Sequence, residues 1–246
     1  LPDFYKGQGY ANPESMGWWS NDTFYGSYGG AAGYNSLGVD PTIVAAMRSI
    51  ATGVANPINA ISKALGGTGG YTATAGLASD ADKGYWAGLN VRDAQGNALV
   101  DFGRREGAGI EGTTYKSQDE ALRATFGAAL DGVTKQVSNA GVEWAKTQAE
   151  ATKKEIDALS GDNIGEQASA LFQKAATEIA GTITAIDRLL KVFPDFSAAT
   201  QDSVHAVSEA IGGMDALNSA YGSFVQNFYS SSEKQALASS DLQKQF

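Results

Sequence analysis

Two helical patterns of apolar residues, separated by a pair of glycines, constrain the fold of this chain most. They lie within residues 204–234, and the first of them ends at Ile211. Gly212 and Gly213 follow, at a point where a helix can end in a left-handed residue without steric cost. The second pattern advances in steps of three and four, which places its members on one helical face: Met214, Leu217, Tyr221, Phe224 and Phe228. The stretch predicts packed helices, and it contains no catalytic motif.

The composition limits the function classes that are open to the chain. Its 246 residues include 18 Lys and Arg against 27 Asp and Glu, and the net charge of −9 disfavours proteins that grip nucleic acid phosphates. Cysteine is absent, which excludes disulfides, cysteine zinc sites and thiol nucleophiles. The single histidine, His205, lies in a helical pattern, so we expect neither a Ser-His-Asp arrangement nor a histidine metal site. We expect no metal and no cofactor, and no apolar run reaches the length of a conventional transmembrane helix.

Residues 1–38 are dense in aromatic residues and glycine and show neither a helical nor a strand period. We interpret them as an irregular arm that packs on the surface, because aromatic rings supply contact area while glycine makes ordering costly. An arm that becomes ordered on another subunit is the alternative. The chain begins with Leu1 and ends in a helical pattern, so we expect a piece of a longer polypeptide, with a processed chain as the alternative.

Residues 39–65 predict an apolar helix. Asp40 and Pro41 match an N-cap followed by the first helical residue, and Pro57 is expected to kink or restart the helix. The low charge of this segment favours a buried helix, and a membrane-active helix is the alternative. The candidate membrane-active residues are Ile43, Met47, Ile50, Val54, Ile58 and Ile61.

Residues 66–116 predict a glycine-rich link followed by one small β-hairpin. Residues 66–84 are rich in Gly, Thr, Ala and Ser, and we interpret them as a connection. Residues 85–92 and 98–104 have the composition of two strands, and the loop between them, 93–97, contains a glycine. Because an isolated hairpin is marginal in water, we expect this one to pack on a helix or on a neighbouring chain.

The rest of the chain predicts helices. In the helix expected at 142–159, Lys146, Glu150 and Lys154 recur at four-residue steps, which is typical of a solvated face. The longest pattern, 164–193, would form a helix of about 29 residues and roughly 43 Å. Three sites match capped helix starts: Ser117–Glu120, Asn163–Glu166 and Ser230–Glu233.

We therefore expect a mainly α fold, with elongated helical segments, one small β-hairpin and an irregular N-terminal segment rich in glycine and aromatic residues. Its parts are the arm at 1–38, the proline-containing helix at 39–65, the link and hairpin at 66–116 and the helical region at 117–246. The apolar face at 214–228 needs a partner. We expect it to pack on the 164–193 helix and on copies of itself, with Tyr221, Phe224 and Phe228 nearest to the contact between chains.

Two other function classes stay open on the residues alone. Glycoside hydrolysis needs two carboxylates at a set separation, and Asp101, Glu106 and Glu111 near the hairpin could supply them in a cell-wall hydrolase. The aromatic arm at 1–38 could instead be the binding face of a surface adhesin.

From Gly212 to Lys234 the sequence resembles the C-terminal part of the tail tape measure proteins of long-tailed, siphovirus-like bacteriophages. In those proteins a Gly-Gly-hydrophobic-x-x-Leu segment leads into a helix rich in Tyr and Phe, and then into a Phe-Tyr, Ser or Thr, Glu-Lys ending. The matching residues here are Gly212, Gly213, Met214, Leu217, Tyr221, Phe224, Phe228, Tyr229, Ser232, Glu233 and Lys234. The upstream order of elements is also similar, so the resemblance covers residues 37–246 and is densest over 164–235.

The resemblance implies a structural, non-enzymatic role. Members of this family occupy the lumen of the tail tube, set tail length during assembly and end in the tail tip, and on infection they leave ahead of the DNA and help its passage through the envelope. For this chain it implies a coiled-coil homo-oligomer, with a trimer expected, that contacts tail tip or hub proteins and tail tube proteins. It further implies DNA passing without specific binding, contact with the host membrane after ejection, and a location in the virion, in the tail lumen and tip, after assembly in the host cytoplasm.

Overall fold

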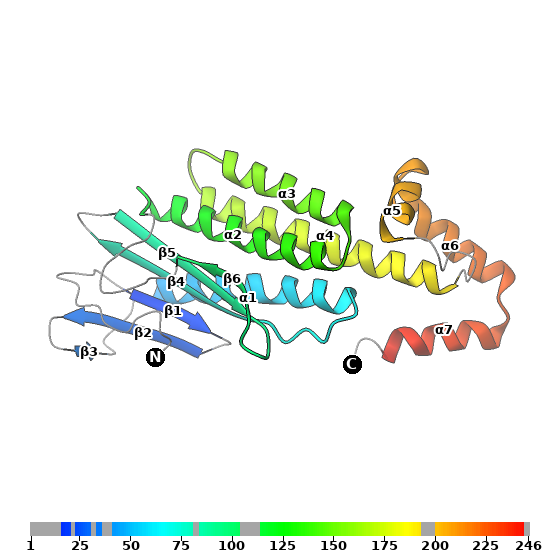
Figure 1. Cartoon of the computed structure of the whole chain (residues 1–246), viewed down its shortest axis with the longest axis horizontal. Helices are drawn as coiled ribbons and strands as arrows, with labels where there is room; N and C mark the ends of the chain where they lie inside the picture. The colour runs from blue at the N-terminus through cyan, green and yellow to red at the C-terminus, as the bar shows by residue number, and fades with distance from the viewer. Residues whose placement is uncertain are drawn as a thin grey trace. The chain divides into compact units, whose positions relative to one another are not determined.

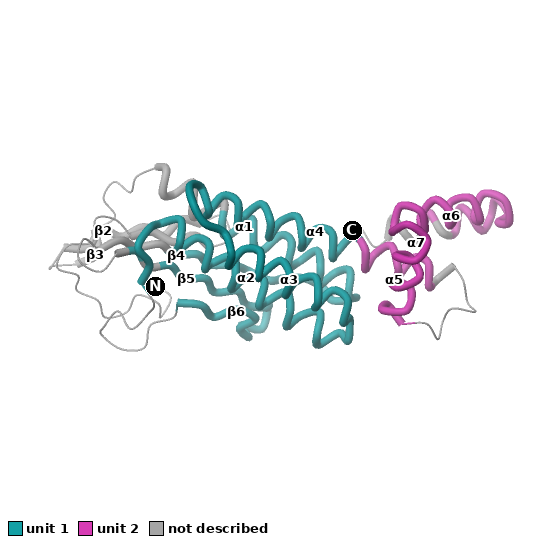
Figure 2. Tube along the Cα trace, turned by 90° about the horizontal axis from the view of Figure 1, so that it is seen from above, with its two compact units in different colours: residues 1–181 teal, residues 182–246 magenta. Residues whose placement is uncertain are grey.

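The computed structural model of the chain describes residues 16–20, 23–30, 33–35, 41–80, 84–103, 114–192 and 200–243. For residues before Ile50, and for a few positions beside the remaining gaps, it describes the backbone alone. The chain is mainly helical, as expected, and divides into two compact units, residues 1–181 and 182–246 (Figure 2).

Unit 1 contains an antiparallel sheet that is larger than the expected hairpin (Figure 1). Its strands are β1 (Met16–Ser20), β2 (Thr23–Gly30), β3 (Gly33–Asn35), β4 (Thr72–Asp80), β5 (Gly84–Arg92) and β6 (Ala98–Phe102). In space they follow the order β3-β2-β1-β4-β5-β6, and each neighbouring pair is antiparallel. The predicted hairpin is thus confirmed as β5–β6, and β4 pairs with its strand β5.

Two segments differ from the expectation. Residues 66–84 are not only a connection, because β4 occupies most of them. Its inward residues are as small as Ala73 and Ala75, both 1% exposed, so the alternation of apolar and polar residues that marks a strand is weak. The segment 1–38 was expected to be irregular, but it contains β1, β2 and β3. Aromatic residues follow one another directly in β1, as in Trp18-Trp19, so the sequence shows no alternation with a period of two.

The loop of the β5–β6 hairpin is organised by one carboxylate. Asp93 accepts hydrogen bonds from the backbone N–H of Gln95 at 3.0 Å and of Asn97 at 2.8 Å, and from Asn97 Nδ2 at 2.9 Å. The bond from the Asn97 side chain, with the backbone bonds, holds the pKa of this exposed carboxyl below its ordinary value. Gly96 has a φ of +87°, which is the left-handed conformation that the glycine of such a loop supplies.

Two helices cover one face of the sheet (Figure 1). Helix α1 (Pro41–Ala64) lies against β1 and β4, and helix α2 (Gln118–Asn139) lies against β5 and β6. The face they cover buries alternate strand residues: Ala73, Ala75, Leu89, Val91 and Val100. Gly132 of α2 makes the close approach possible, because a Cβ there would lie 2.5 Å from Val100 Cγ2.

Helix α1 runs through Pro57 without a restart, contrary to one of the two expectations for this residue. It is tied to the sheet by Asn59, whose Nδ2 donates to the Tyr71 carbonyl and whose Oδ1 accepts from the Tyr71 N–H, both at 2.8 Å. The helix ends close to the predicted residue 65, at a glycine pair where the Gly66 N–H donates to the Lys63 carbonyl and the Gly67 N–H to the Ser62 carbonyl. This pattern is a Schellman motif.

Helices α3 (Glu143–Ala158) and α4 (Ile164–Val192) complete the helical layer. The rings of Phe126 in α2 and Phe172 in α4 lie 5.9 Å apart, centre to centre, and both side chains are buried. Arg123 Nη1 donates to the Leu159 carbonyl at 2.8 Å, which satisfies a carbonyl at the end of α3. The apolar faces of α1, α2 and α4 are thus buried in the core of unit 1.

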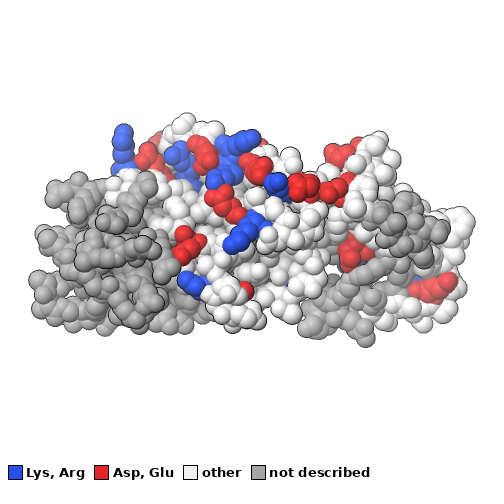
Figure 3. Space-filling model, viewed as in Figure 1, with Lys and Arg blue, Asp and Glu red and all other residues white. Residues whose placement is uncertain are grey.

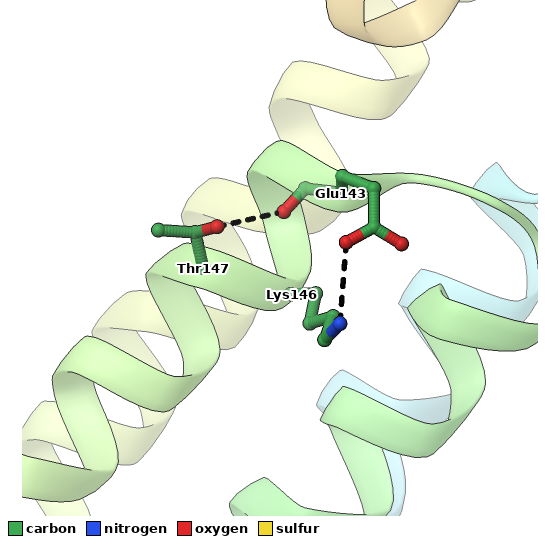
Figure 4. Close-up of polar contacts among 3 residues, drawn as sticks. All are labelled: Glu143, Lys146 and Thr147. Atoms are coloured by element: carbon green, nitrogen blue, oxygen red, sulfur yellow. Dashed lines mark hydrogen bonds and ion pairs between the residues drawn. The ribbon is translucent and has the colours of Figure 1, made fainter.

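The charged side of α3 faces solvent as predicted at Glu150 and Lys154, while Lys146 is half-buried. At the first turn of α3, Lys146 Nζ pairs with Glu143 at 3.2 Å, and Thr147 Oγ1 donates to the Glu143 carbonyl (Figure 4). Basic and acidic side chains alternate over this upper edge of the molecule (Figure 3). Such exposed pairs contribute little to stability, so this is a solubilising surface.

Unit 2 consists of helical segments: the end of α4, α5 (Gln201–Ala210), α6 (Met214–Phe228) and α7 (Ser231–Gln243). The α6 bounds coincide with the apolar pattern in the sequence. Of the capping boxes predicted along the chain, Ser230–Glu233 forms in full, since the Ser230 N–H donates to Glu233 Oε2 at 2.8 Å and the Glu233 N–H to Ser230 Oγ at 3.4 Å. At the start of α2, Ser117 Oγ accepts a hydrogen bond from the Glu120 N–H and caps the helix. The box is incomplete, because the Glu120 carboxylate accepts from the Lys116 N–H and not from the Ser117 N–H.

Candidate functional site

The apolar face of α6 is the strongest candidate for a functional surface. The helix has no buried residue. Met214, Leu217, Tyr221 and Phe224 are half-buried, and Phe228 is 74% exposed. Folded proteins seldom leave a helical face this apolar in contact with water unless it binds something.

The aromatic end of this face is organised within the chain. The rings of Phe224 and Phe228 stack at 5.0 Å, and the ring of Tyr229 meets Phe224 edge-on at 6.1 Å. Lys234 of α7 donates to the Gln226 carbonyl at 2.9 Å, which fixes the turn from α6 to α7. The ordered rings offer a large contact area that loses little side-chain entropy on binding.

Exposed apolar residues also occur in α5 and at its end. They were not among the candidate residues taken from the sequence. Val207 is 50% exposed and Ile211 is 47% exposed, whereas Val204 is buried. The spacing of these residues was visible in the sequence, but their exposure depends on the position of α6. His205 is half-buried in the same helix.

The candidate membrane-active residues of α1 lie in a different environment. Ile50, Val54, Ile58 and Ile61 are 6% exposed or less and belong to the core of unit 1. Burying each of them stabilises the fold by about 1.5–3 kcal/mol, so contact with a membrane would first require the core to open. The side chains of Ile43 and Met47 lie outside the described residues. Within the described part of the chain, no helix combines the length and the apolar composition needed to cross a membrane.

Of the three carboxylates considered for hydrolysis, Asp101 alone lies in the described part of the chain. Asp101 is exposed on β6, where its Oδ1 accepts from Asn90 Nδ2 at 3.1 Å. A general acid of a glycosidase sits in an apolar pocket, whereas the Asp101 side chain is exposed to solvent. Glu106 and Glu111 lie outside the described residues. Among the side chains that the structure describes, no group of three or more His, Asp or Glu is arranged to hold a metal ion.

Comparison of the chain with protein-family models, with curated proteins and with solved structures finds no match.

Proposed function

We propose that this chain is a structural component of a bacteriophage tail and tail tip, as part of a tape measure protein that sets tail length, occupies the tube lumen and helps deliver the genome. The segment 212–234 carries the proposal. It resembles that family at the motif positions between Gly212 and Lys234, and it forms a glycine corner, an aromatic helix and a capped following helix.

The exposed face of α6 suits a protein that works in an assembly. In this proposal Tyr221, Phe224 and Phe228 pack against copies of the chain and against tail tip or tube proteins. The net charge of −9 suits a lining past which DNA must slide without being held. A described surface with interspersed charges on α3 fits a body that stays soluble until it assembles.

The proposal is tested on particles made from the genome that encodes the chain. Peptides of this chain should be detected by mass spectrometry in gradient-purified tails. The substitution Phe228→Asp should lower the yield of complete tails, counted by electron microscopy, whereas Gln226→Asp on the exposed side of the same helix should not. Purified particles that lack the chain, although the lysate contains it, would refute the proposal.

A purified-protein assay separates this function from hydrolysis. We expect no clearing of cell walls in a zymogram. Clearing that is abolished by Asp101→Ala, Glu106→Ala or Glu111→Ala would instead identify a hydrolase. Mass photometry addresses the adhesin alternative, because a chain that stays monomeric at micromolar concentration would favour an adhesin over an assembly component.

A further inference from the structure

The corner between α5 and α6 depends on two glycines in the left-handed region. Gly212 has a φ of +106° and Gly213 a φ of +96°. The Gly213 N–H donates to the Ser208 carbonyl at 2.7 Å and the Gly212 N–H to the Glu209 carbonyl at 3.3 Å, so α5 ends in a Schellman motif. Gly213 is at the same time the N-cap of α6. Any other residue would be strained at these two φ values.

The two helices nevertheless share one heptad register across this corner. With Val204 at position a, the a positions are Val204, Ile211, Asn218 and Val225, and the d positions are Val207, Met214, Tyr221 and Phe228. Helices that meet at a corner have no need of a common register, because the corner sets the face of each one separately. A repeat sustained over residues 204–228 is what a continuous coiled-coil helix requires.

The remaining residues of this span fit the seam of such a helix. Gly212 and Gly213 would occupy positions b and c on the outer side, where they leave no gap between strands. Asp202, Glu209 and Asp215 all fall outside positions a and d. Asn218 is the one polar residue in the seam, and a polar residue at position a fixes the alignment of coiled-coil strands.

In the cornered form the same seam is largely exposed. Val204 is its only buried member, while Val207 is 50%, Ile211 is 47% and Phe228 is 74% exposed. In the single chain, most residues of this apolar repeat are therefore not buried, although such repeats normally mark a buried face. Copies of the same repeat are the occupant that fits it, because each strand of a coiled coil presents the same spacing to the next.

We infer that Gly212–Gly213 is a conformational switch: the single chain folds into the corner, and association of copies converts α5 and α6 into one continuous helix over residues 201–228. The inference rests on the self-assembly in the proposed function and adds how it is controlled. Glycine disfavours a helix interior, so the straight form needs the burial of the seam between copies. The a and d positions are therefore buried only when copies of the chain associate.

The test uses the full chain with spin labels on cysteines introduced by Ala206→Cys and Asn227→Cys. The chain has no cysteine of its own, and both positions are exposed and lie at position c. They are 21 residues apart, so a continuous helix separates their Cα atoms by about 32 Å. The cornered form turns the chain at Gly212–Gly213, so it brings the two labels closer together than a straight helix does. We expect the longer distance to grow with protein concentration.

The switch is shifted by the double substitution Gly212→Ala and Gly213→Ala. Alanine is strained in the corner and favours the helix, by roughly 20-fold for the two positions from helix propensity alone. The variant should populate the longer distance and associate at lower concentration, measured by sedimentation. Gly222→Ala is the matched control, since it adds a methyl group in α6 where nothing lies within 4 Å of the new Cβ.

Two results would overturn the inference. One is association of the double variant with the short distance retained. The other is a double variant that neither straightens nor associates more than Gly222→Ala. Tryptophan fluorescence of unit 1, which contains Trp144, verifies that each variant is folded. The experiment on purified tails decides the proposed function separately, because a chain absent from particles can still straighten on association, and a chain present in them can associate through a fixed corner.

Discussion

In unit 1, the apolar pattern of α4 is buried: Ile164, Ala168, Phe172, Ala176 and Ile179 are at most 5% exposed. In unit 2, the pattern of α6 has the same steps of three and four, and none of its residues is buried. Helix α4 has neighbours within its own unit, as the Phe126–Phe172 contact and the Gln148–Glu178 hydrogen bond show. A helical period thus predicts which face of a helix packs. It does not predict whether the packing partner lies in the same unit or elsewhere in an assembly.

Phenylalanine-to-alanine substitutions should give the largest difference in stability loss between the two units. Phe172→Ala removes a fully buried ring and should lower the free energy of unfolding of unit 1 by about 3–5 kcal/mol. Phe228→Ala should change the stability of the single chain by only about 0.5 kcal/mol, because the ring is already exposed. Urea denaturation followed by tryptophan fluorescence measures the first, and hydrogen exchange of α6 measures the second. Equal losses at the two positions would break the contrast.

Asparagine-to-alanine substitutions test whether the two units also differ in the stability that polar side chains contribute. Asn59→Ala leaves the N–H and the carbonyl of Tyr71 without their partner and should cost about 1–3 kcal/mol in unit 1. Asn227→Ala, on the exposed side of α6, should be nearly neutral. Thermal unfolding of both variants provides the measurement. A neutral Asn59→Ala would mean that the start of β4 is held by the sheet alone.

Glycine-to-alanine substitutions should give effects of opposite sign. Gly132→Ala places a Cβ 2.5 Å from Val100 Cγ2, and the overpacking penalty of about 1–3 kcal/mol should outweigh the gain in helix propensity of about 1 kcal/mol. Gly222→Ala meets open space and should stabilise α6. Amide exchange rates in α2 and α6 compare the two. Stabilisation by both substitutions would show that α2 can move away from β6.

The smallest effect in unit 2 should come from acid, at the first turn of α7. The hydrogen bonds from the Ser230 hydroxyl and N–H lower the pKa of Glu233. Because the folded pKa is depressed, the contribution is complete above the ordinary glutamate pKa of about 4.3 and is lost as the pH falls through the lowered value. The first turn of α7 should then fray, with faster exchange of its amides. Glu233→Gln should abolish this pH dependence.

The helices could be predicted because their signals are local. The apolar periods of α1, α4 and α6 and the Ser230–Glu233 cap each lie within a few turns of chain. Within α4, Phe172 is buried while the neighbouring Leu171 is half-buried, because the buried face of a long helix drifts relative to a fixed pattern. The mainly helical class followed from these local signals.

The sheet was harder to predict because its pairing is not local. Strand β4 is lined by alanine and threonine, and its role depends on β1, which lies more than 50 residues earlier. The bond between Asn59 and Tyr71 has no sequence signature. The α6 face was found from its spacing, but the exposure of Val207 and Ile211 and the backbone of Gly212–Gly213 appear only in three dimensions.

Because of the two hydrogen bonds between Asn59 and Tyr71, the length of the turn that precedes β4 need not set the position of the strand. The start of β4 is fixed by α1 directly, while Gly67 and Thr68 between them are exposed. An epitope or a fluorescent peptide inserted after Thr68 should leave the register of the sheet intact, since lengthening a surface loop costs little entropy. The chain thus carries a ready attachment point for following it inside a larger particle.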